Sequence, residues 1–137
     1  MGFERLRYFF LAPSKLVPNF HDGRFNGIRL AANKEARLFL ATADGQDFEL
    51  ELGGVRKLRL DGMKEGNIIL DVVSRSELTA SDIESLYGKD LDSSIAMPLL
   101  QTAQSEKLQT LEINPSYGVE ALILFKTLNI EQISPQS

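Results

Sequence analysis

The sequence predicts a mainly β protein, with an α+β fold as the alternative. Most segments alternate apolar and polar residues with the period of a half-buried strand, and turn-forming links such as Asp-Gly and Gly-Gly join them. Helical periodicity is confined to the stretch between about Thr79 and Lys107. We therefore expect an antiparallel β-sandwich or a strongly curved sheet of about eight strands, with one or two short helices inserted in that stretch.

The first expected strand runs from Phe3 to Leu11, where apolar side chains alternate with arginines, and it ends at Pro13. The segment from Pro18 to Gly27 contains both Asp-Gly and Asn-Gly, and either dipeptide suits the positive φ angles of a hairpin turn. Strands are then expected from Ile28 to Ala32 and from Ala36 to Thr42. The second of these is apolar on both faces, which is typical of a strand in the interior of a sheet or sandwich.

The segment from Phe48 to Leu60 holds two alternating strands around a pair of glycines. With a two-residue loop, apolar residues of one strand would lie opposite charged residues of the other. A three-residue loop, residues 53–55, instead sets Leu50 opposite Leu58 on one face and opposite charges against each other on the second face. We therefore expect a hairpin that these three residues close.

A helix is expected after the next strand. Either Thr79 or Ser81 can act as its N-cap, with Asp82 or Glu84 three residues later. Gly88 then ends the helix. The sequence leaves open which of the two starts is used.

A second helix is expected from about Ser94 to Lys107, because apolar residues recur there at helical spacing. Pro98 would fall in its first turn, where the missing N–H of proline does no harm. The chain then returns to strands from Leu108 to Ile113 and from Val119 to Leu128. The last strand contains the run ALILF, which is apolar on both faces and is therefore expected to be central in the sheet.

Composition excludes several classes of function. The chain has 137 residues, and its formal net charge is -4. Nucleic acid is not an expected partner, because neutralisation of phosphates by clustered cations supplies most of that affinity. A short basic group exists at Arg56, Lys57 and Arg59, but we expect the nearby Glu49 and Glu51 to offset it.

One globular domain is expected over residues 1–133, with a flexible tail at residues 134–137. The apolar run near the N-terminus, Tyr8 to Ala12, is too short for a signal peptide or a membrane span. The sequence has no cysteine, which excludes disulfides, thiolate nucleophiles and cysteine-ligated metals. We expect a soluble cytoplasmic protein without a membrane partner.

The stretch LDGMKEGNIILDVVSR, from Leu60 to Arg75, gathers carboxylates and glycines around an apolar run. It does not match a calcium loop of the EF-hand type, because Met63 would occupy a ligand position. It does not match a phosphate loop either, because Gly66 is not followed by Lys and then Ser or Thr. We interpret its glycines as turn residues between two strands.

Within that stretch a strand from Ile68 to Val73 is expected to place Asp71 on the same face as apolar neighbours. A carboxylate in such surroundings needs a partner. The candidates are Arg75, further along the same face, and Arg59 on the preceding strand. We favour a structural ion pair or hydrogen bond at Asp71 over a catalytic role.

His21 is the only histidine, and it lies beside Asp22 in a turn-rich segment. A histidine with an orienting carboxylate can act as a general base. Neighbouring residues of an extended chain point in opposite directions, however, so Asp22 is not expected to orient the ring. Because no hydroxyl lies in a nucleophile-elbow motif, we favour an exposed loop histidine and lean away from an enzyme.

The favoured hypothesis is a non-catalytic, cytoplasmic protein-interaction module of immunity or inhibitor type, whose acidic surface meets a basic partner protein. The alternative is a small-molecule or carbohydrate-binding β-sandwich whose loops 21–26 and 61–67 converge on a pocket. Its candidate ligand-binding residues are His21, Asp22, Arg24, Asp61, Glu65, Asn67 and Asp71. No metal or cofactor is expected, and a homo-oligomer is left open.

Overall fold

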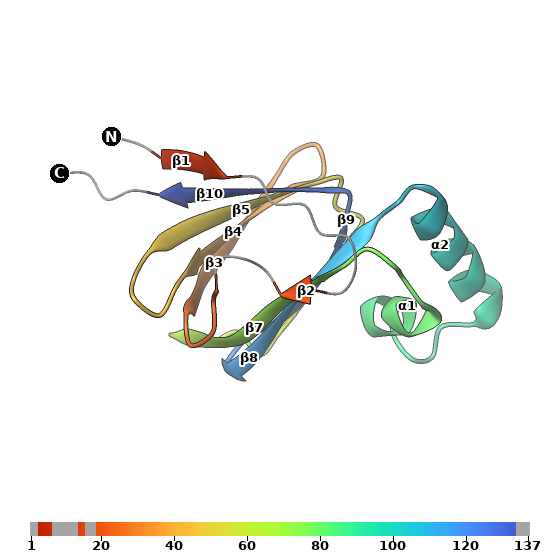
Figure 1. Cartoon of the computed structure of the whole chain (residues 1–137). Coiled ribbons are helices and arrows are strands. Elements are labelled where there is room, and N and C mark those ends of the chain that lie inside the picture. The colour runs from red at the N-terminus through yellow and green to blue at the C-terminus, as the bar shows by residue number, and fades with distance from the viewer. Residues whose placement is uncertain (1–2, 7–13, 16–18, 134–137) are drawn as a thin grey trace.

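Ten strands pair in one antiparallel sheet within the part of the chain that the computed structural model describes, residues 3–6, 14–15 and 19–133. They lie in the order β1-β10-β5-β4-β3-β7-β8-β9-β6, and β2 pairs with β7 beside this path. The sheet is strongly curved and does not close into a barrel (Figure 1). The mainly antiparallel β fold predicted from the sequence is confirmed. The strands are β1 (Phe3–Leu6), β2 (Ser14–Lys15), β3 (Arg24–Ala31), β4 (Glu35–Ala41), β5 (Asp47–Gly53), β6 (Lys57–Asp61), β7 (Asn67–Arg75), β8 (Gln109–Tyr117), β9 (Glu120–Phe125) and β10 (Thr127–Ile133).

The curvature of the sheet encloses its main hydrophobic core. Strands β3, β4, β5 and β10 form one side, and β7, β8 and β9 form the other (Figure 1). Leu38 and Leu50 from the first side and Ile113 from the second are fully buried in the same core. The rings of Phe20 and Phe48 pack edge to face, with 5.5 Å between their centroids. Burial of each such side chain contributes about 1.5 to 3 kcal/mol and holds the two sides together.

The strand expected from Val119 to Leu128 is in fact two strands, β9 and β10, which separate at Lys126. β9 pairs with β8, whereas β10 pairs with β5, so the chain passes from one side of the curved sheet to the other at this residue. Of the strand expected from Phe3 to Leu11, the first four residues form β1, and residues 7–11 lie outside the described part. The tail expected at residues 134–137 also lies outside it.

β9 is apolar on both faces because different layers cover them. Ala121, Ile123 and Phe125 pack in the main core, while Leu122 and Leu124 pack in a second cluster with the two helices, α1 (Ala80–Tyr87) and α2 (Ser93–Ser105). The helices lie together on the outer face of the sheet (Figure 1). The predicted burial of both faces is confirmed, although β9 lies next to the edge strand β6 rather than in the middle of the sheet.

The hairpin predicted between Phe48 and Leu60 does not form. β5 pairs with β4 and β10, and β6 pairs with β9. Leu50 and Leu58 nevertheless both pack in the main core, as their alternation requires. Alternation determines which side chains face inward, but more than one partner strand can satisfy the same alternation.

The dipeptide Asp22-Gly23 makes the turn before β3. The N–H of Gly23 donates to the carbonyl of Phe20 at 2.8 Å, and Asp22 has a positive φ of 61°. Asn26-Gly27 instead lies inside β3, where the register with β4 shifts between Phe25 and Gly27 and makes a bulge. β4 lies between β3 and β5, in the interior position predicted for it.

Helix α1 begins after Thr79 and not after Ser81. The carboxylate of Asp82 accepts hydrogen bonds from the backbone N–H of Thr79 at 2.7 Å and from its hydroxyl at 3.1 Å. Arg75 lies 3.6 Å from the same carboxylate. Gly88 ends the helix with a φ of 109°, as predicted. Asp82 therefore links the start of α1 to the end of β7.

Helix α2 is capped by Asp92, whose carboxylate accepts a hydrogen bond from the N–H of Ser94 at 3.0 Å. Pro98 was expected in the first turn and lies inside the helix beyond it. Because proline has no N–H, the carbonyl of Ser94, four residues earlier, lacks its helical donor. The helix thus lacks one backbone hydrogen bond between two residues that line the groove described below.

Replacing Asp82 should destabilise the protein, because it removes the carboxylate that caps α1. We expect Asp82→Ala to lower the free energy of unfolding by about 2 kcal/mol, the contribution typical of a hydrogen bond to a charged group. Glu84→Ala, at an exposed position of the same helix, should change it by less than about 0.5 kcal/mol. Urea unfolding followed by circular dichroism measures both values. Equal losses in the two variants would contradict Thr79 as the start of the helix.

Candidate interaction site

The two loops expected to bind a ligand, residues 21–26 and 61–67, do lie side by side. β3 starts within the first loop and pairs with β7 next to the second, through Arg24 and Ile68. The two loops therefore converge, as the alternative function requires. The four pockets found around the helices and neighbouring strands, however, are lined by residues of neither loop.

His21 contacts the main chain of β7. Its Nδ1 lies 2.8 Å from the carbonyl oxygen of Leu70, and its Nε2 lies 3.5 Å from the carboxylate of Asp22. The expectation that these neighbours point apart is wrong, because Asp22 adopts the left-handed conformation of a turn instead of an extended one. The two side chains are 55% and 65% exposed. A histidine held by a carbonyl in open solvent fits the favoured interpretation of an exposed loop residue.

Asp71 has a partner, and that partner is Asn114. The amide nitrogen of Asn114 donates to Asp71 at 2.8 Å. The predicted alternation along β7 is wrong here, because the register with β8 shifts at Leu70. The bulge sends Ile69 into the core and turns Leu70 and Asp71 away from it. Arg75, one of the expected partners, pairs with two other carboxylates.

Asn67 is buried and its amide is fully used within the fold. Its oxygen accepts from the N–H groups of Lys64 and Val119, at 2.9 and 3.0 Å. Its nitrogen donates to the carbonyl of Lys64 at 2.8 Å and to the sulfur of Met63 at 3.3 Å. Gly118 approaches so closely that a Cβ there would lie 2.3 Å from the same oxygen. Asn67 therefore orders the loop and the β8–β9 turn, and has no hydrogen-bonding capacity left for a ligand.

Asp61 and Glu65 are exposed, and only Asp61 belongs to a strand. Asp61 belongs to β6, which β8 and β9 separate from β7 and Asp71. Three strand spacings correspond to about 14 Å along the sheet. Among the described residues, no group of three or more His, Cys, Asp or Glu side chains is placed to hold a metal ion.

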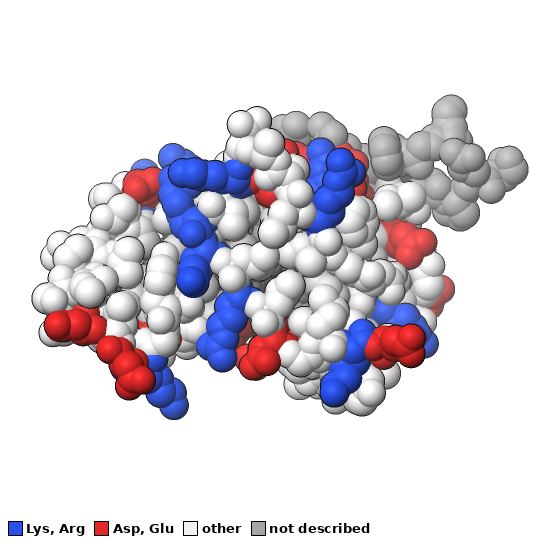
Figure 2. All heavy atoms as spheres, turned by 180° about the vertical axis from the view of Figure 1, so that it is seen from behind, with Lys and Arg blue, Asp and Glu red and all other residues white. Residues whose placement is uncertain are grey.

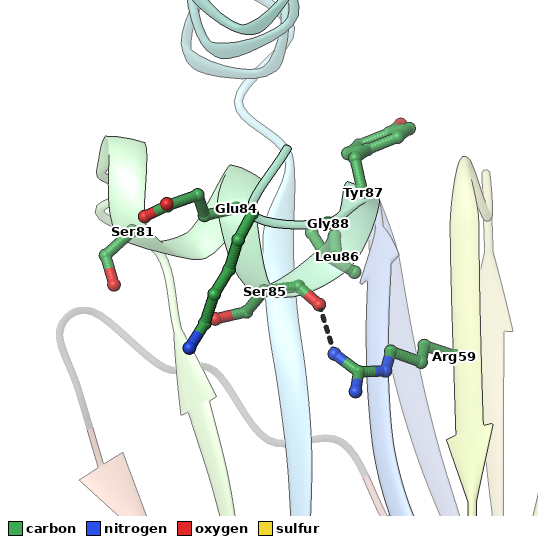
Figure 3. Close-up of a pocket in the computed structure, with 8 residues that line it drawn as sticks. Arg59, Ser81, Glu84, Ser85, Leu86, Tyr87 and Gly88 are labelled. Atoms are coloured by element: carbon green, nitrogen blue, oxygen red, sulfur yellow. Dashed lines mark hydrogen bonds between the residues drawn. The ribbon is translucent and has the colours of Figure 1, made fainter. Parts of the chain in front are cut away.

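A polar hollow of about 570 Å³ lies against α1 (Figure 3). Arg59 of β6 reaches across it and donates to the carbonyl of Ser85 at 2.7 Å, the dashed contact in Figure 3. This bond ties the edge strand to the helix. Tyr87, at the end of α1, also lines the hollow, and burial raises the pKa of its phenol.

An apolar groove of about 430 Å³ shares Tyr87 with this hollow. Helix α2 packs on α1 and stands away from the sheet (Figure 1). The groove lies between the helices and β9. The α2 residues that line it recur at the spacing of one helical stripe. We define the groove by Arg56, Tyr87 of α1, Ile95, Pro98, Leu99 and Thr102 of α2, and Leu124 of β9.

Helix α2 leaves apolar side chains exposed, and one of them, Ile95, lies at the groove. Ile95 is 53% exposed and Met97 is 48% exposed. Within the same helix, Leu100 and Ala103 are the buried residues. A surface helix ordinarily turns its apolar stripe to a core, so this incomplete burial distinguishes α2 from the rest of the fold.

Cations gather around one carboxylate beside the groove. Arg56, which lines the groove, donates to Glu106 at 2.7 Å. That hydrogen bond, together with the charges of Arg56, Lys126 and Lys34, holds the pKa of Glu106 below its usual value of 4.5, against an opposing effect of desolvation. We call Lys34, Arg56 and Lys126 the basic cluster. Figure 2, which views the molecule from behind, shows Lys and Arg side chains in a band beside the end of the molecule that carries the helices.

The basic cluster was not predicted from the sequence, because we expected Glu49 and Glu51 to offset the basic group at residues 56–59. Both carboxylates instead pair with Arg37 of β4, at 3.2 and 3.3 Å. The carboxylate that does reach Arg56 is fifty positions away along the chain. The sequence therefore signalled Arg56, but neither Lys34 and Lys126 nor the contact with Glu106.

Comparisons with protein-family models, with curated protein sequences and with solved structures find no match to this chain. In the part of the chain that the structure describes, no helix has the length and apolar character needed to cross a bilayer. The groove and the basic cluster are thus the features from which a function has to be inferred.

Asn67 should matter for stability. We expect Asn67→Ala to lower the free energy of unfolding by about 2 to 4 kcal/mol, because it leaves buried N–H groups without an acceptor. Asn26→Ala, at an exposed position of β3, is the matched control and should change it by less than about 0.5 kcal/mol. Thermal or urea unfolding measures both. A neutral Asn67→Ala variant would reopen the question of a ligand-binding role.

The carboxyl group of Glu106 should titrate below 4.5 in an NMR pH titration, and Arg56→Gln should move its midpoint upward, because the hydrogen bond is lost. A carboxyl group whose pKa is lower in the folded state than in the unfolded state stabilises the fold at pH values above the unfolded-state pKa. This contribution disappears as the pH falls through the pKa of the folded state. Since the side chain is exposed, solvent screens the effect on stability, and the titration is the better measurement.

Arg29→Gln removes an exposed arginine of β3 and serves as the control for that titration. It should leave the midpoint of Glu106 unchanged. If both variants shift the midpoint equally, the general charge of the protein and not the basic cluster sets the pKa.

Proposed function

We propose that this protein is a protein-interaction module and that the apolar groove is its binding face. One observation carries the proposal. Helix α2 leaves Ile95 53% exposed at a groove of about 430 Å³, where a further apolar side chain can pack. Exposed apolar surface that borders a groove and has polar surroundings is a mark of an interaction site.

The chemistry of the groove supports binding over catalysis. Arg56 is the charged group among the described residues that line it, and an arginine does not act as a proton acceptor at neutral pH. The histidine that could serve as a general base, His21, lies against β7, outside the groove. An immunity or inhibitor type of module remains part of this proposal, as does a cytoplasmic location, with which the absence of cysteine is compatible.

That an acidic surface of this protein meets a basic partner stays a prediction, and it concerns faces of the molecule other than the groove. At the groove the described charges have the opposite sign, because the basic cluster lies there. The loop-based small-molecule or carbohydrate site also stays a prediction. The full use of the Asn67 amide within the fold gives it no support.

The groove can be tested with a matched pair of surface variants, Ile95→Glu and Leu70→Glu. Both residues are exposed, and Leu70 lies on β7 beside the predicted loop site. Proteins captured from an extract of the source cells are identified, purified and titrated by calorimetry against both variants. Ile95→Glu should weaken binding by about tenfold or more, because it puts a carboxylate at the apolar groove, and Leu70→Glu should not.

A partner that binds Ile95→Glu as tightly as the original protein contradicts the proposal. A partner lost with Leu70→Glu alone would move the binding face to the loops around His21. Unfolding measurements on both variants control for stability.

A further inference from the structure

We propose that the groove binds an acidic amphipathic helix of a partner protein, and that Glu106 occupies the place of the partner's carboxylate while the groove is empty. This inference rests on the proposed function of the groove. It adds the chemistry of the partner and a contact within the chain that competes with it.

The shape of the lining favours a helix. Ile95, Pro98, Leu99 and Thr102 follow one another at intervals of three, one and three residues along α2, so they form one continuous stripe. Helices pack through such stripes, and groove-binding helices anchor residues at the same spacing. A partner helix laid beside α2 can therefore place its apolar side chains between this stripe and Leu124 of β9.

The charges favour an acidic polar face on that helix. The guanidinium of Arg56 is oriented by two contacts, to the carbonyl of Gly54 at 3.0 Å and to Glu106 at 2.7 Å. Lys57 adds a fourth positive charge to those of the basic cluster, and its ammonium lies 5.1 Å from the centre of the Tyr87 ring, which lines the groove. A carboxylate placed at this margin of the groove meets an arginine that is already positioned.

Glu106 shows where such a carboxylate is stabilised. The basic cluster lowers the pKa of its side chain, so the surrounding charges favour the ionised form. The side chain is exposed, and an exposed ion pair contributes little stability, so a partner carboxylate can replace it at low cost. Glu106 is then a competitor: removing its charge should strengthen the binding of an acidic helix, while removing the charge of Arg56 should weaken it.

The probes are three designed, fluorescently labelled peptides of about 18 residues, long enough to form a helix. They share one leucine stripe and carry Glu, Gln or Lys at the polar positions. In fluorescence anisotropy with the full chain, the Glu peptide should bind most tightly, the Gln peptide less tightly and the Lys peptide most weakly. Raising the salt concentration should weaken the Glu peptide and leave the Gln peptide almost unchanged.

Two variants test the competing contact. Glu106→Gln should tighten the Glu peptide by about twofold to fivefold, and Arg56→Gln should weaken it by at least as much, while neither should change the Gln peptide. The matched controls are Glu84→Gln and Arg29→Gln, which remove exposed charges elsewhere and should leave all three affinities as they are.

The outcomes separate this inference from the proposed function. If Ile95→Glu leaves peptide binding intact, the groove is not the binding face and both proposals are wrong. If Ile95→Glu abolishes binding but the three peptides bind equally, the groove stands and the acidic partner is overturned. If Glu106→Gln leaves the affinity of the Glu peptide unchanged, the competing contact is overturned.

Two other occupants of the groove are also tested. Dodecanoate that shifts the NMR signals of the groove, with no binding of any peptide, would point to a small amphiphile and overturn the inference. Analytical ultracentrifugation would show a second copy of this chain in the groove if the original protein were a dimer and Ile95→Glu a monomer. That result would also overturn the inference.

Discussion

The rest of the structure depends on the need of β9 to bury both of its faces. Its inner side chains complete the main core, and its outer leucines, Leu122 and Leu124, need a cover that a single curved sheet cannot provide. The two helices supply that cover. Arg59 of the edge strand β6 reaches the carbonyl of Ser85 and fixes α1 over this face. The position of α2, and therefore of the groove, follows from the packing of α2 on α1.

The groove exists because the cover is incomplete. Helix α2 buries Leu100 and Ala103 but leaves the stripe that contains Ile95 and Leu99 open beside Leu124. Its interior proline removes a helical hydrogen bond on the same stretch. Extra burial of Ile95 alone would contribute about 1 kcal/mol or more. The monomer forgoes this free energy of burial when it leaves the stripe exposed. A partner that buries the stripe would recover it.

The fold also redistributes charge. The chain carries a net charge of -4, yet the margin of the groove is basic, because Lys34, Arg56 and Lys126 come together from distant segments. Glu49 and Glu51, on the preceding strand, are held by Arg37 on β4, while Glu106 approaches from the end of α2. A net charge thus says little about the sign of the potential at any one site.

The sequence by itself indicated most of the strands, two possible starts and the end of α1, and the burial of both faces of β9, because alternation, capping and apolar runs act over a few residues. It also identified carboxylates and amides in the 61–71 stretch, but not that Asn67 and Asp71 bond within the fold. Only the tertiary structure decided that β6 pairs with β9, that a bulge at Leu70 turns Asp71 outward, and that Arg56 meets Glu106. These choices depend on contacts between distant segments, and no local pattern distinguishes among the strands and carboxylates that could make them.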